Sequence, residues 1–270
     1  MSYQGFVRPT IRFFKENFGP DSNFIKCETL RVLEIGVDRG QSTIPIIQNL
    51  TSKCYNGSFY FVGVDVQVRP ELRATIEQFE NITYMPGDKT QPANNVFIIE
   101  QNSLKFLEKT LPDSGRLFDL VFLDGDHNYK TVTKELSMLS KKMSLIGWIV
   151  IDDFNSRWAD QDLYYSDRSE YKENTKATPR ENSEKQGVRT AVQDFIRSNE
   201  RWEIWDDHRV DMCILYRKDV YQRLSLYSPT AEGAINPRDL FWVQEFQPTF
   251  IKRVLQHTES EKNQDETRLG

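Results

Sequence analysis

The sequence predicts an α/β protein with a doubly wound, mostly parallel seven-stranded sheet that ends in an antiparallel pair of strands. Two observations support this class. Short apolar runs alternate with helical patterns over most of the chain, which implies right-handed β-α-β crossovers and a parallel sheet. The last two apolar runs, near residues 202–205 and 212–216, follow each other without a helix between them. They should therefore pair antiparallel at one edge of the sheet.

Five further strands and the helices between them can be read from the apolar pattern. The strands should lie near residues 31–35, 60–65, 96–99, 118–123 and 147–151. The helices should lie near residues 41–50, 70–79, 101–109, 132–143 and 187–198. In the fourth of these helices, Val132, Leu136, Leu139 and Met143 have the spacing of an amphipathic face, which predicts packing against the sheet.

The chain should divide into a main domain of residues 1–217 and a C-terminal extension of residues 218–270 with a frayed tail. The domain should begin with a helix at residues 6–18 and have its core at residues 31–217. The polar segment of residues 155–185 interrupts the alternating pattern. Loops of this length are usually lids or disordered segments, and we expect a lid, with a plain surface insertion as the alternative.

Composition excludes several function classes. The chain has 270 residues, of which 38% are hydrophobic, and this is enough for a sizeable core. A net charge of −5 argues against a nucleic-acid partner. The three cysteines, Cys27, Cys54 and Cys213, lack metal-site spacing, so we expect reduced thiols. No apolar run reaches the roughly 18 residues of a membrane span, and we expect a cytoplasmic protein without a membrane partner. A homo-oligomer is left open.

A glycine turn follows the first strand and is the most informative motif. Gly36 and Gly40 stand four residues apart, between the apolar run and a helical pattern. Such a turn brings backbone N–H groups and a helix start up to a ligand. A dinucleotide-binding turn would read Gly-x-Gly-x-x-Gly, whereas this one reads Glu-x-Gly-x-x-x-Gly, beginning at Glu34.

With these residues, Glu34, Gly36 and Gly40, the chain resembles the class I S-adenosylmethionine-dependent methyltransferases. The resemblance covers roughly residues 31–217 and implies their Rossmann-like fold. It also implies that Glu34 belongs to the cofactor site and that the backbone from Gly36 to Gly40 faces the methionine part of the cofactor.

The same resemblance assigns residues at the next two strand ends. Asp65, after the second strand, would accept hydrogen bonds from both ribose hydroxyls, and a carboxylate is able to accept two such donors. The alternative for Asp65 is a helix cap or a solvated strand end. Asn102 and Ser103, after the third strand, would lie beside the adenine.

Three acids follow two neighbouring strands. Asp124 comes after the fourth strand, and Asp152 and Asp153 come after the fifth. Adjacent strands lie about 4.8 Å apart, so these side chains should converge. Carboxylates with water suit Mg²⁺, which would relieve their mutual repulsion.

The pattern Phe-Leu-Asp-Gly-Asp-His-x-Tyr, followed by Gly-x-Ile-Val-Ile-Asp-Asp, resembles the metal-dependent O-methyltransferases of the catechol and macrolide-sugar types. This resemblance implies that Asp124, Asp152 and Asp153 are metal ligands, with Asp124 also close to the cofactor and to the reaction. Catechol-type enzymes carry Asn where Asp153 stands. They use a lysine as base near the position of His127.

His127 is the expected general base, because its ordinary pKa of about 6.5 suits proton removal near neutrality. The alternative is a histidine that caps the following helix. Asp126 is expected to cap that helix, whereas His208 and His257 should be surface residues.

We therefore expect an S-adenosylmethionine-dependent O-methyltransferase that uses Mg²⁺ and a small hydroxylated acceptor, such as a sugar, a glycoside or a catechol-like molecule. The lid should close over the acceptor, with Trp158, Tyr164, Tyr165 and Tyr171 able to stack on a ring. Two alternatives are a metal-independent methyltransferase and a non-catalytic binding or assembly protein that retains the fold.

Overall fold

An eight-stranded sheet forms the centre of the computed structural model, which describes residues 10–11, 29–51, 58–79, 83–84, 94–110, 118–206 and 211–220. The strand order is β3-β4-β2-β1-β5-β6-β8-β7. The strands are β1 (Thr29–Ile35), β2 (Ser58–Asp65), β3 (Thr83–Tyr84), β4 (Asn94–Glu100), β5 (Phe118–Leu123), β6 (Met143–Ile151), β7 (Trp202–Asp206) and β8 (Cys213–Arg217).

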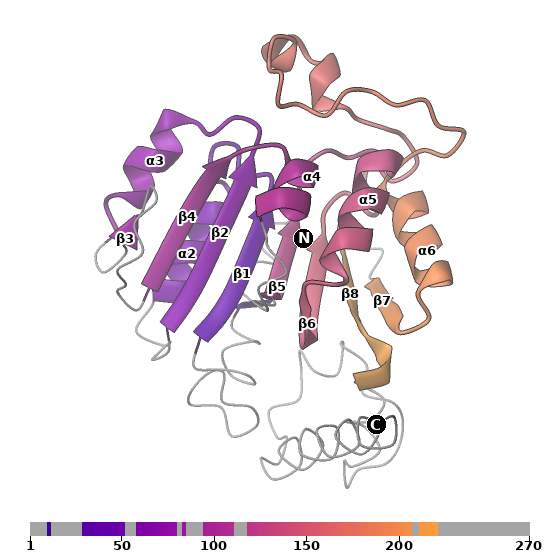
Figure 1. The fold of residues 1–270 in the computed structure, drawn as a ribbon, viewed down its shortest axis with the longest axis horizontal. Helices are drawn as coiled ribbons and strands as arrows, with labels where there is room; N and C mark the ends of the chain where they lie inside the picture. The colour runs from indigo at the N-terminus through magenta and orange to yellow at the C-terminus, as the bar shows by residue number, and fades with distance from the viewer. Residues whose placement is uncertain are drawn as a thin grey trace, which may run out of the picture.

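The predicted fold class is confirmed. The strands from β3 to β6 pair in parallel, and β8 runs antiparallel to both β6 and β7. The eighth strand is the two-residue β3, which extends the predicted seven strands at one edge. The carboxyl ends of β1, β2, β4, β5 and β6 consequently meet along one edge of the sheet (Figure 1).

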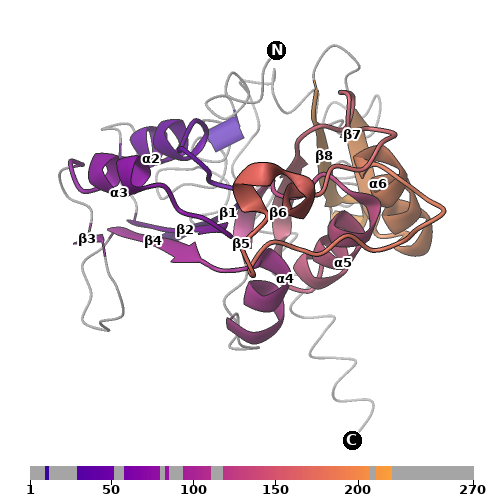
Figure 2. The same ribbon diagram turned by 90° about the horizontal axis from the view of Figure 1, so that it is seen from above.

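Helices cover both faces of the sheet, as a doubly wound fold requires. They are α2 (Thr43–Thr51), α3 (Pro70–Ile76), α4 (Ser103–Lys105), α5 (Tyr129–Leu139) and α6 (Val188–Ser198), with a π-helical turn η1 (Phe106–Thr110) after α4. Seen from above, α2 and α3 lie on one face, whereas α4, α5 and α6 lie on the other (Figure 2). Pro45 is tolerated because it lies in the first turn of α2.

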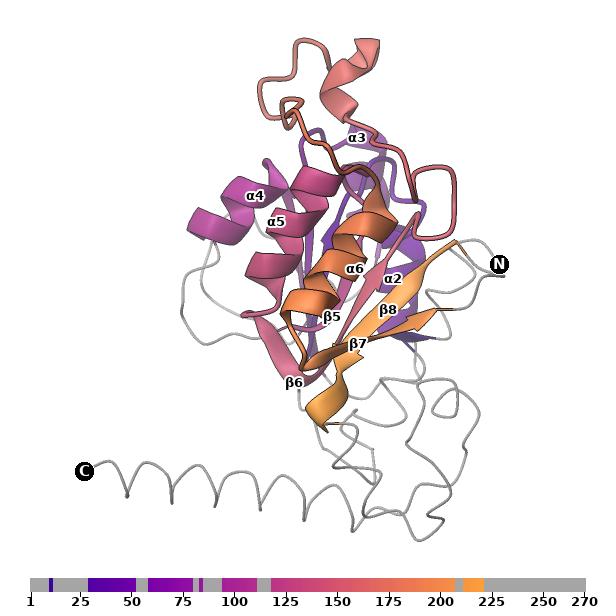
Figure 3. The same cartoon turned by 90° about the vertical axis from the view of Figure 1, so that its right-hand side faces the viewer.

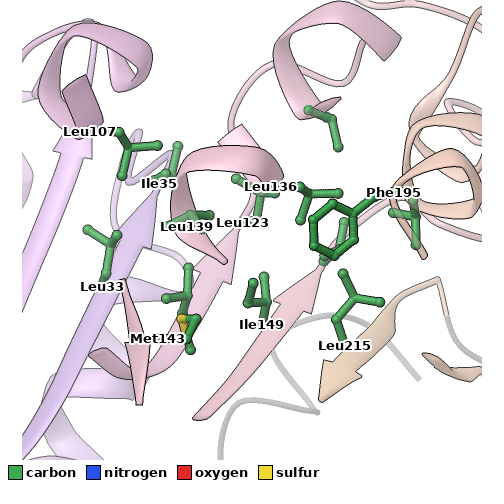
Figure 4. Packing of buried hydrophobic residues seen from close by; sticks show 14 of the residues in the cluster. Leu33, Ile35, Leu107, Leu123, Leu136, Leu139, Met143, Ile149, Phe195 and Leu215 are labelled. Carbon is green, nitrogen blue, oxygen red and sulfur yellow. The ribbon is translucent and has the colours of Figure 1, made fainter. Parts of the chain in front are cut away.

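Neighbouring residues of each strand contribute to opposite faces, so the sheet separates two hydrophobic clusters. Val32 packs with α2 and α3, whereas the next residue, Leu33, packs with α5 and α6. Figure 4 shows the second cluster, in which Leu136 and Leu139 of α5 meet strand residues such as Ile149. This packing holds the strand ends, and the loops that follow them, in fixed positions.

One predicted helix boundary is wrong. Helix α5 ends at Leu139, and Met143 is the first residue of β6. Met143 still packs in the same cluster as Leu136 and Leu139, because β6 pairs from Met143 with Phe118 of β5. The apolar spacing therefore identified a core residue but placed it in the wrong element.

The segment of residues 155–185 passes over the carboxyl ends of the strands (Figures 1 and 3). It contains two 3-10 turns, η2 (Tyr165–Asp167) and η3 (Ser169–Tyr171). Among the described residues, no helix is both long and apolar enough to cross a membrane.

Several expectations lie outside the described residues. They concern the predicted N-terminal helix apart from residues 10 and 11, the extension beyond residue 220, and the side chains of Cys27, Cys54, His208 and His257.

Candidate cofactor and acceptor site

A cavity of about 320 Å³ lies at the carboxyl ends of β1, β2, β4 and β5. Its walls come from the loops after these strands and from the segment of residues 155–185. The lining residues are Ile35, Gly36, Val37, Asp38, Arg39, Gln41, Ser42, Val64, Asp65, Val66, Arg69, Gln101, Ser103, Asp124, Gly125, Asp126, Tyr165, Arg168, Glu170, Tyr171, Ala177 and Thr178.

The turn after β1 requires glycine at Gly36. Its φ of +90° is in the left-handed region, and a Cβ atom there would lie 1.9 Å from the carbonyl oxygen of Asp124. The Gly36 amide donates a hydrogen bond of 2.8 Å to Val64 O. The backbone of this turn therefore lies directly against the ends of two neighbouring strands. Gly36 lines the cavity, whereas Gly40 supports the turn from outside the lining.

Glu34 lies beneath the turn and outside the cavity lining. Its carboxylate is fully buried and accepts hydrogen bonds from Ser42 Oγ (2.5 Å) and Thr43 Oγ1 (2.7 Å) at the start of α2. Burial raises the pKa of Glu34 to about 7, although the two hydroxyls act against this shift. These hydrogen bonds connect the end of β1 to the start of α2.

Asp65 is the most completely hydrogen-bonded acid of the cavity wall. Its Oδ2 accepts from the amides of Val37 (2.9 Å) and Asp38 (2.8 Å), and its Oδ1 accepts from Gln67 N (2.9 Å). A carboxylate offers about four lone-pair positions, so acceptor capacity remains toward the cavity. Burial raises the pKa of Asp65, and the three amides oppose that shift.

The two residues predicted at the end of β4 separate in the structure. Ser103 lines the cavity, whereas Asn102 does not. Asn102 caps α4 through Oδ1, which accepts from Lys105 N (3.2 Å), and its Nδ2 donates to Lys176 O and Thr178 Oγ1, both at 3.0 Å. Its amide therefore joins the strand end to the segment of residues 155–185.

The acids after β5 and β6 form a tight cluster at the far end of the cavity. Burial and the neighbouring charge of Asp152 raise the pKa of Asp124, and burial and the charge of Asp153 raise the pKa of Asp152 to about 7. Asp124 lines the cavity, whereas Asp152, Asp153 and His127 lie beside it without lining it. In the part of the chain that the structure describes, no three His, Cys, Asp or Glu side chains are arranged to hold a metal ion.

Asp153 points toward His127. Its Oδ2 lies 3.0 Å from His127 Nδ1, and its Oδ1 accepts a hydrogen bond from Ser156 Oγ. The φ of +58° at Asp153, the second residue after β6, is rare for a residue with a side chain. His127 Nε2 lies 3.8 Å from Asp124 Oδ1. Burial lowers the pKa of His127, although Asp153 opposes the shift.

The cap predicted for α5 is wrong. Asn128 caps this helix, because its side chain accepts from Thr131 N at 2.8 Å. Asp126 instead accepts from Tyr165 N at 3.0 Å, and burial raises its pKa to about 6. Asp126 therefore connects the end of β5 to the segment of residues 155–185.

The cavity also contains residues that the sequence did not single out. Arg69, Arg168, Glu170 and Thr178 had no motif to mark them, because they reach the cavity only through folding of α3 and of the segment of residues 155–185. Of the four aromatic residues expected to stack on a ring, Tyr165 and Tyr171 line the cavity. Tyr164 is buried with its hydroxyl 3.3 Å from Glu181 O, and Trp158 lies against Arg157.

Residues 33–154 match the model of a protein family described as a methyltransferase domain. The comparison with curated proteins found no match. Among solved structures, MNMC2 from Aquifex aeolicus is 11% identical, with a TM-score of 0.46, over 91% of this chain and 70% of that chain. An O-methyltransferase from Bacillus cereus in complex with SAH is 16% identical, with a TM-score of 0.41, over 78% and 79%.

A third solved structure is MycE methyltransferase from the mycinamycin biosynthetic pathway, in complex with Mg, SAH and mycinamycin VI. It is 16% identical, with a TM-score of 0.40, over 79% of this chain. The chain covers only 55% of MycE. All three likenesses lie below a TM-score of 0.5, so the assignment does not depend on them.

The family match begins in β1 and ends just after the acids that follow β6, so it includes the glycine turn, Asp65 and the whole acid cluster. The mostly parallel sheet and its antiparallel β8 agree with the fold class predicted from the sequence. Residues 33–154, slightly less than half of the chain, therefore match a methyltransferase domain.

Proposed function

We propose that the protein transfers a methyl group from S-adenosylmethionine to a hydroxyl of a small hydroxylated acceptor, with the help of Mg²⁺. The observation that carries the proposal is the cluster of Asp124, His127, Asp152 and Asp153 at the end of the cofactor cavity. Sugars, glycosides and catechol-like molecules are the proposed acceptors, because they carry hydroxyls next to each other.

The proposed cofactor contacts follow the order of the strand ends. The backbone at Gly36 would face the methionine part, and the remaining acceptor capacity of Asp65 would serve the ribose hydroxyls. Ser103 would lie beside the adenine, with Asn102 in a supporting role through its contacts to Thr178. Glu34 would act indirectly, because it braces the turn.

His127 is the proposed base. Its Nδ1 lies 3.0 Å from Asp153, so the neutral ring would donate its proton there and leave Nε2 as the acceptor. The acceptor oxygen would attack the methyl carbon in line with the breaking C–S bond, and Nε2 would take the hydroxyl proton. The products would be the methyl ether, S-adenosylhomocysteine and a protonated His127, which returns its proton to water.

The donor set fits a hard cation. Asp124 and Asp152 are close carboxylates with raised pKa values, and among the described residues neither forms a salt bridge to lysine or arginine. Mg²⁺ commonly uses one or two carboxylates together with water and substrate oxygens. When bound, the ion would supply positive charge that orients two neighbouring hydroxyls and makes one more acidic. Asp153 as a third ligand stays a prediction, because its carboxylate is engaged by His127 and Ser156.

The alternative is a metal-independent methyltransferase in which the same acids orient the acceptor. The engagement of Asp153 by His127 favours this reading, because it leaves two acids rather than three for an ion. The proposed cytoplasmic location, and a homo-oligomeric state, are independent of this choice.

Labelled S-adenosylmethionine and a panel of catechol, 3,4-dihydroxybenzoate and methyl glycosides test the proposal, with EDTA and with Mg²⁺ restored. We expect methylation that EDTA abolishes and Mg²⁺ recovers. Full activity in EDTA would overturn the role of the metal and leave the metal-independent alternative. Calorimetric titration of Mg²⁺ gives a second readout, because binding should disappear in Asp152→Asn and persist in Asp160→Asn, where the acid is exposed.

A further inference from the structure

The cavity has a roof made by residues 164–178, which we call the cover segment. It contributes Tyr165, Arg168, Glu170, Tyr171, Ala177 and Thr178 to the cavity lining. Its two 3-10 turns cross above the strand ends in the middle of the sheet (Figure 2). The cover segment therefore faces the glycine turn and Asp65, where the cofactor is expected, rather than only the acid cluster.

Hydrogen bonds connect the cover segment to three different strand ends. Asn174 Nδ2 donates to Val66 O after β2 (3.0 Å), Asn102 Nδ2 after β4 donates to Thr178 Oγ1 (3.0 Å), and Tyr165 N donates to Asp126 Oδ1 after β5 (3.0 Å). All three strand ends border the cavity. These contacts therefore hold the cover segment beside the cavity.

Two tyrosines of the cover segment line different parts of the cavity. Tyr171 is 6% exposed and hydrogen-bonds to Arg69. The negative charge of Asp65 raises the pKa of the Tyr171 hydroxyl, which indicates that Tyr171 lies near the end of β2. Tyr165 has its ring centroid 6.2 Å from that of His127, so it lies over the β5 side. The two tyrosine rings meet edge to face, with centroids 5.2 Å apart.

The ring of Tyr165 is suited to contact a positively charged group. Arg168 already lies over one face of this ring, with its guanidinium carbon 4.9 Å from the centroid. Tyr165 lines the cavity, and burial together with the charge of Asp124 raises the pKa of its phenol, so that the phenol stays protonated. S-adenosylmethionine carries a positive sulfonium at its reacting end, whereas S-adenosylhomocysteine has a neutral thioether.

We propose that the cover segment closes over the cofactor and that Tyr165 distinguishes the sulfonium of S-adenosylmethionine from the thioether of S-adenosylhomocysteine. An aromatic face attracts a cation within about 6 Å, and the attraction increases when water is excluded. The same segment limits release of the product, because its hydrogen bonds must open first. This inference rests on the cofactor cavity, and it does not depend on the proposed metal or acceptor.

Calorimetry with the full chain tests the role of Tyr165, through the dissociation constants of both cofactor forms. We expect Tyr165→Leu to weaken S-adenosylmethionine about five- to thirtyfold more than S-adenosylhomocysteine, the range of a desolvated cation–π contact. Tyr165→Phe retains the ring and should keep the ratio within about threefold. Tyr164→Phe is the matched control, because Tyr164 is the neighbouring tyrosine and does not line the cavity.

An unchanged ratio in Tyr165→Leu would overturn the sulfonium contact, whether both forms bind normally or both bind more weakly. Should this variant fail to fold, as judged by circular dichroism, Tyr165→Met replaces it, since it retains volume but has no aromatic face. No acceptor or metal is present in these titrations, so failure of the proposed O-methylation would leave their outcome unaffected.

Thr178→Val tests product release separately. The change removes the hydroxyl that accepts from Asn102 and also hydrogen-bonds to Asp126, and each typical hydrogen bond corresponds to about a two- to tenfold effect. We expect S-adenosylhomocysteine to dissociate faster by that factor in stopped-flow displacement, while the binding ratio of the two cofactor forms stays unchanged. An unchanged dissociation rate would show that the cover segment does not limit release.

Discussion

The two ends of the cavity differ in how their acids are satisfied. At the β2 end, Asp65 accepts three backbone hydrogen bonds, two of them from the turn after β1. At the β5 and β6 end, burial and the charge of Asp152 raise the pKa of Asp124, whereas burial and the charge of Asp153 raise the pKa of Asp152. One end is complete without a ligand, whereas the other carries charge that the described side chains leave poorly compensated.

This difference indicates two ways of preparing a site. Backbone amides that already point at a carboxylate keep it ionised and fixed, so a ligand there meets a preorganised acceptor. Clustered acids hold their charge at the expense of folding stability, and a cation or a proton relieves the repulsion. The four variants below separate these two situations, beginning with the largest expected effect.

Replacing Asp152 by Asn should lower kcat about a thousandfold, because metal-assisted charge stabilisation contributes several kcal/mol. The free energy of unfolding should stay equal or rise at pH 8, since one repelling charge is removed from beside Asp124. Radiometric turnover and thermal melts measure both quantities, with the exposed Asp160→Asn as the control. A variant that retains turnover would contradict the distinct role of the acid cluster.

Replacing His127 by Gln should lower kcat about a hundredfold or more, the usual contribution of a general base. The dissociation constant for S-adenosylmethionine should change less than about threefold, because His127 does not line the cofactor cavity. Steady-state kinetics and calorimetry give the two values. A loss of cofactor affinity with normal kcat would place His127 in the wrong half of the site. Asp153→Asn should show a smaller loss, since it retains an acceptor for Nδ1.

Replacing Asp65 by Asn should weaken cofactor binding about ten- to a hundredfold, because hydrogen bonds to an ionised group contribute about 1.5–3 kcal/mol. At saturating cofactor, kcat should fall only slightly. Calorimetry measures the affinity, and Glu77→Gln, a change on the exposed side of the turn after α3, serves as the control. Equal affinity for the variant and the wild type would remove Asp65 from the cofactor site.

Replacing Glu34 by Gln should change how stability depends on pH. Burial raises the pKa of Glu34 from 4.5 to about 7, so the folded state binds the proton more tightly than the unfolded state. Stability from this group is therefore greatest below pH 4.5 and falls as the pH rises to 7, by up to about 1.4 kcal/mol per pH unit. The difference between the two unfolding curves, from urea titrations at several pH values, should show this slope. Parallel curves would mean that Glu34 ionises as an ordinary acid.

Sequence patterns identified most elements, and they identified the residues whose neighbours along the chain define them. Strand β5 coincides with its predicted range, and the glycines of the first turn were recognisable because their spacing is local. The end of α5 was wrongly predicted at Met143. Met143 has the spacing of the apolar helix face, but it is the first residue of β6 and packs in the same hydrophobic cluster as α5. The cap at Asn128 was missed because Asp126 and Asn128 suit that position equally well in sequence.

The sequence alone determined the alternation of strands and helices, the glycine turn, and the placing of acids after the β2, β5 and β6 runs. These features depend on residues that are neighbours along the chain. Only the tertiary structure decided that Asp153 faces His127, that Glu34 lies beneath the turn, and that residues 164–178 roof the cavity. Those contacts arise only when the sheet brings its strand ends together and burial fixes which polar groups must pair.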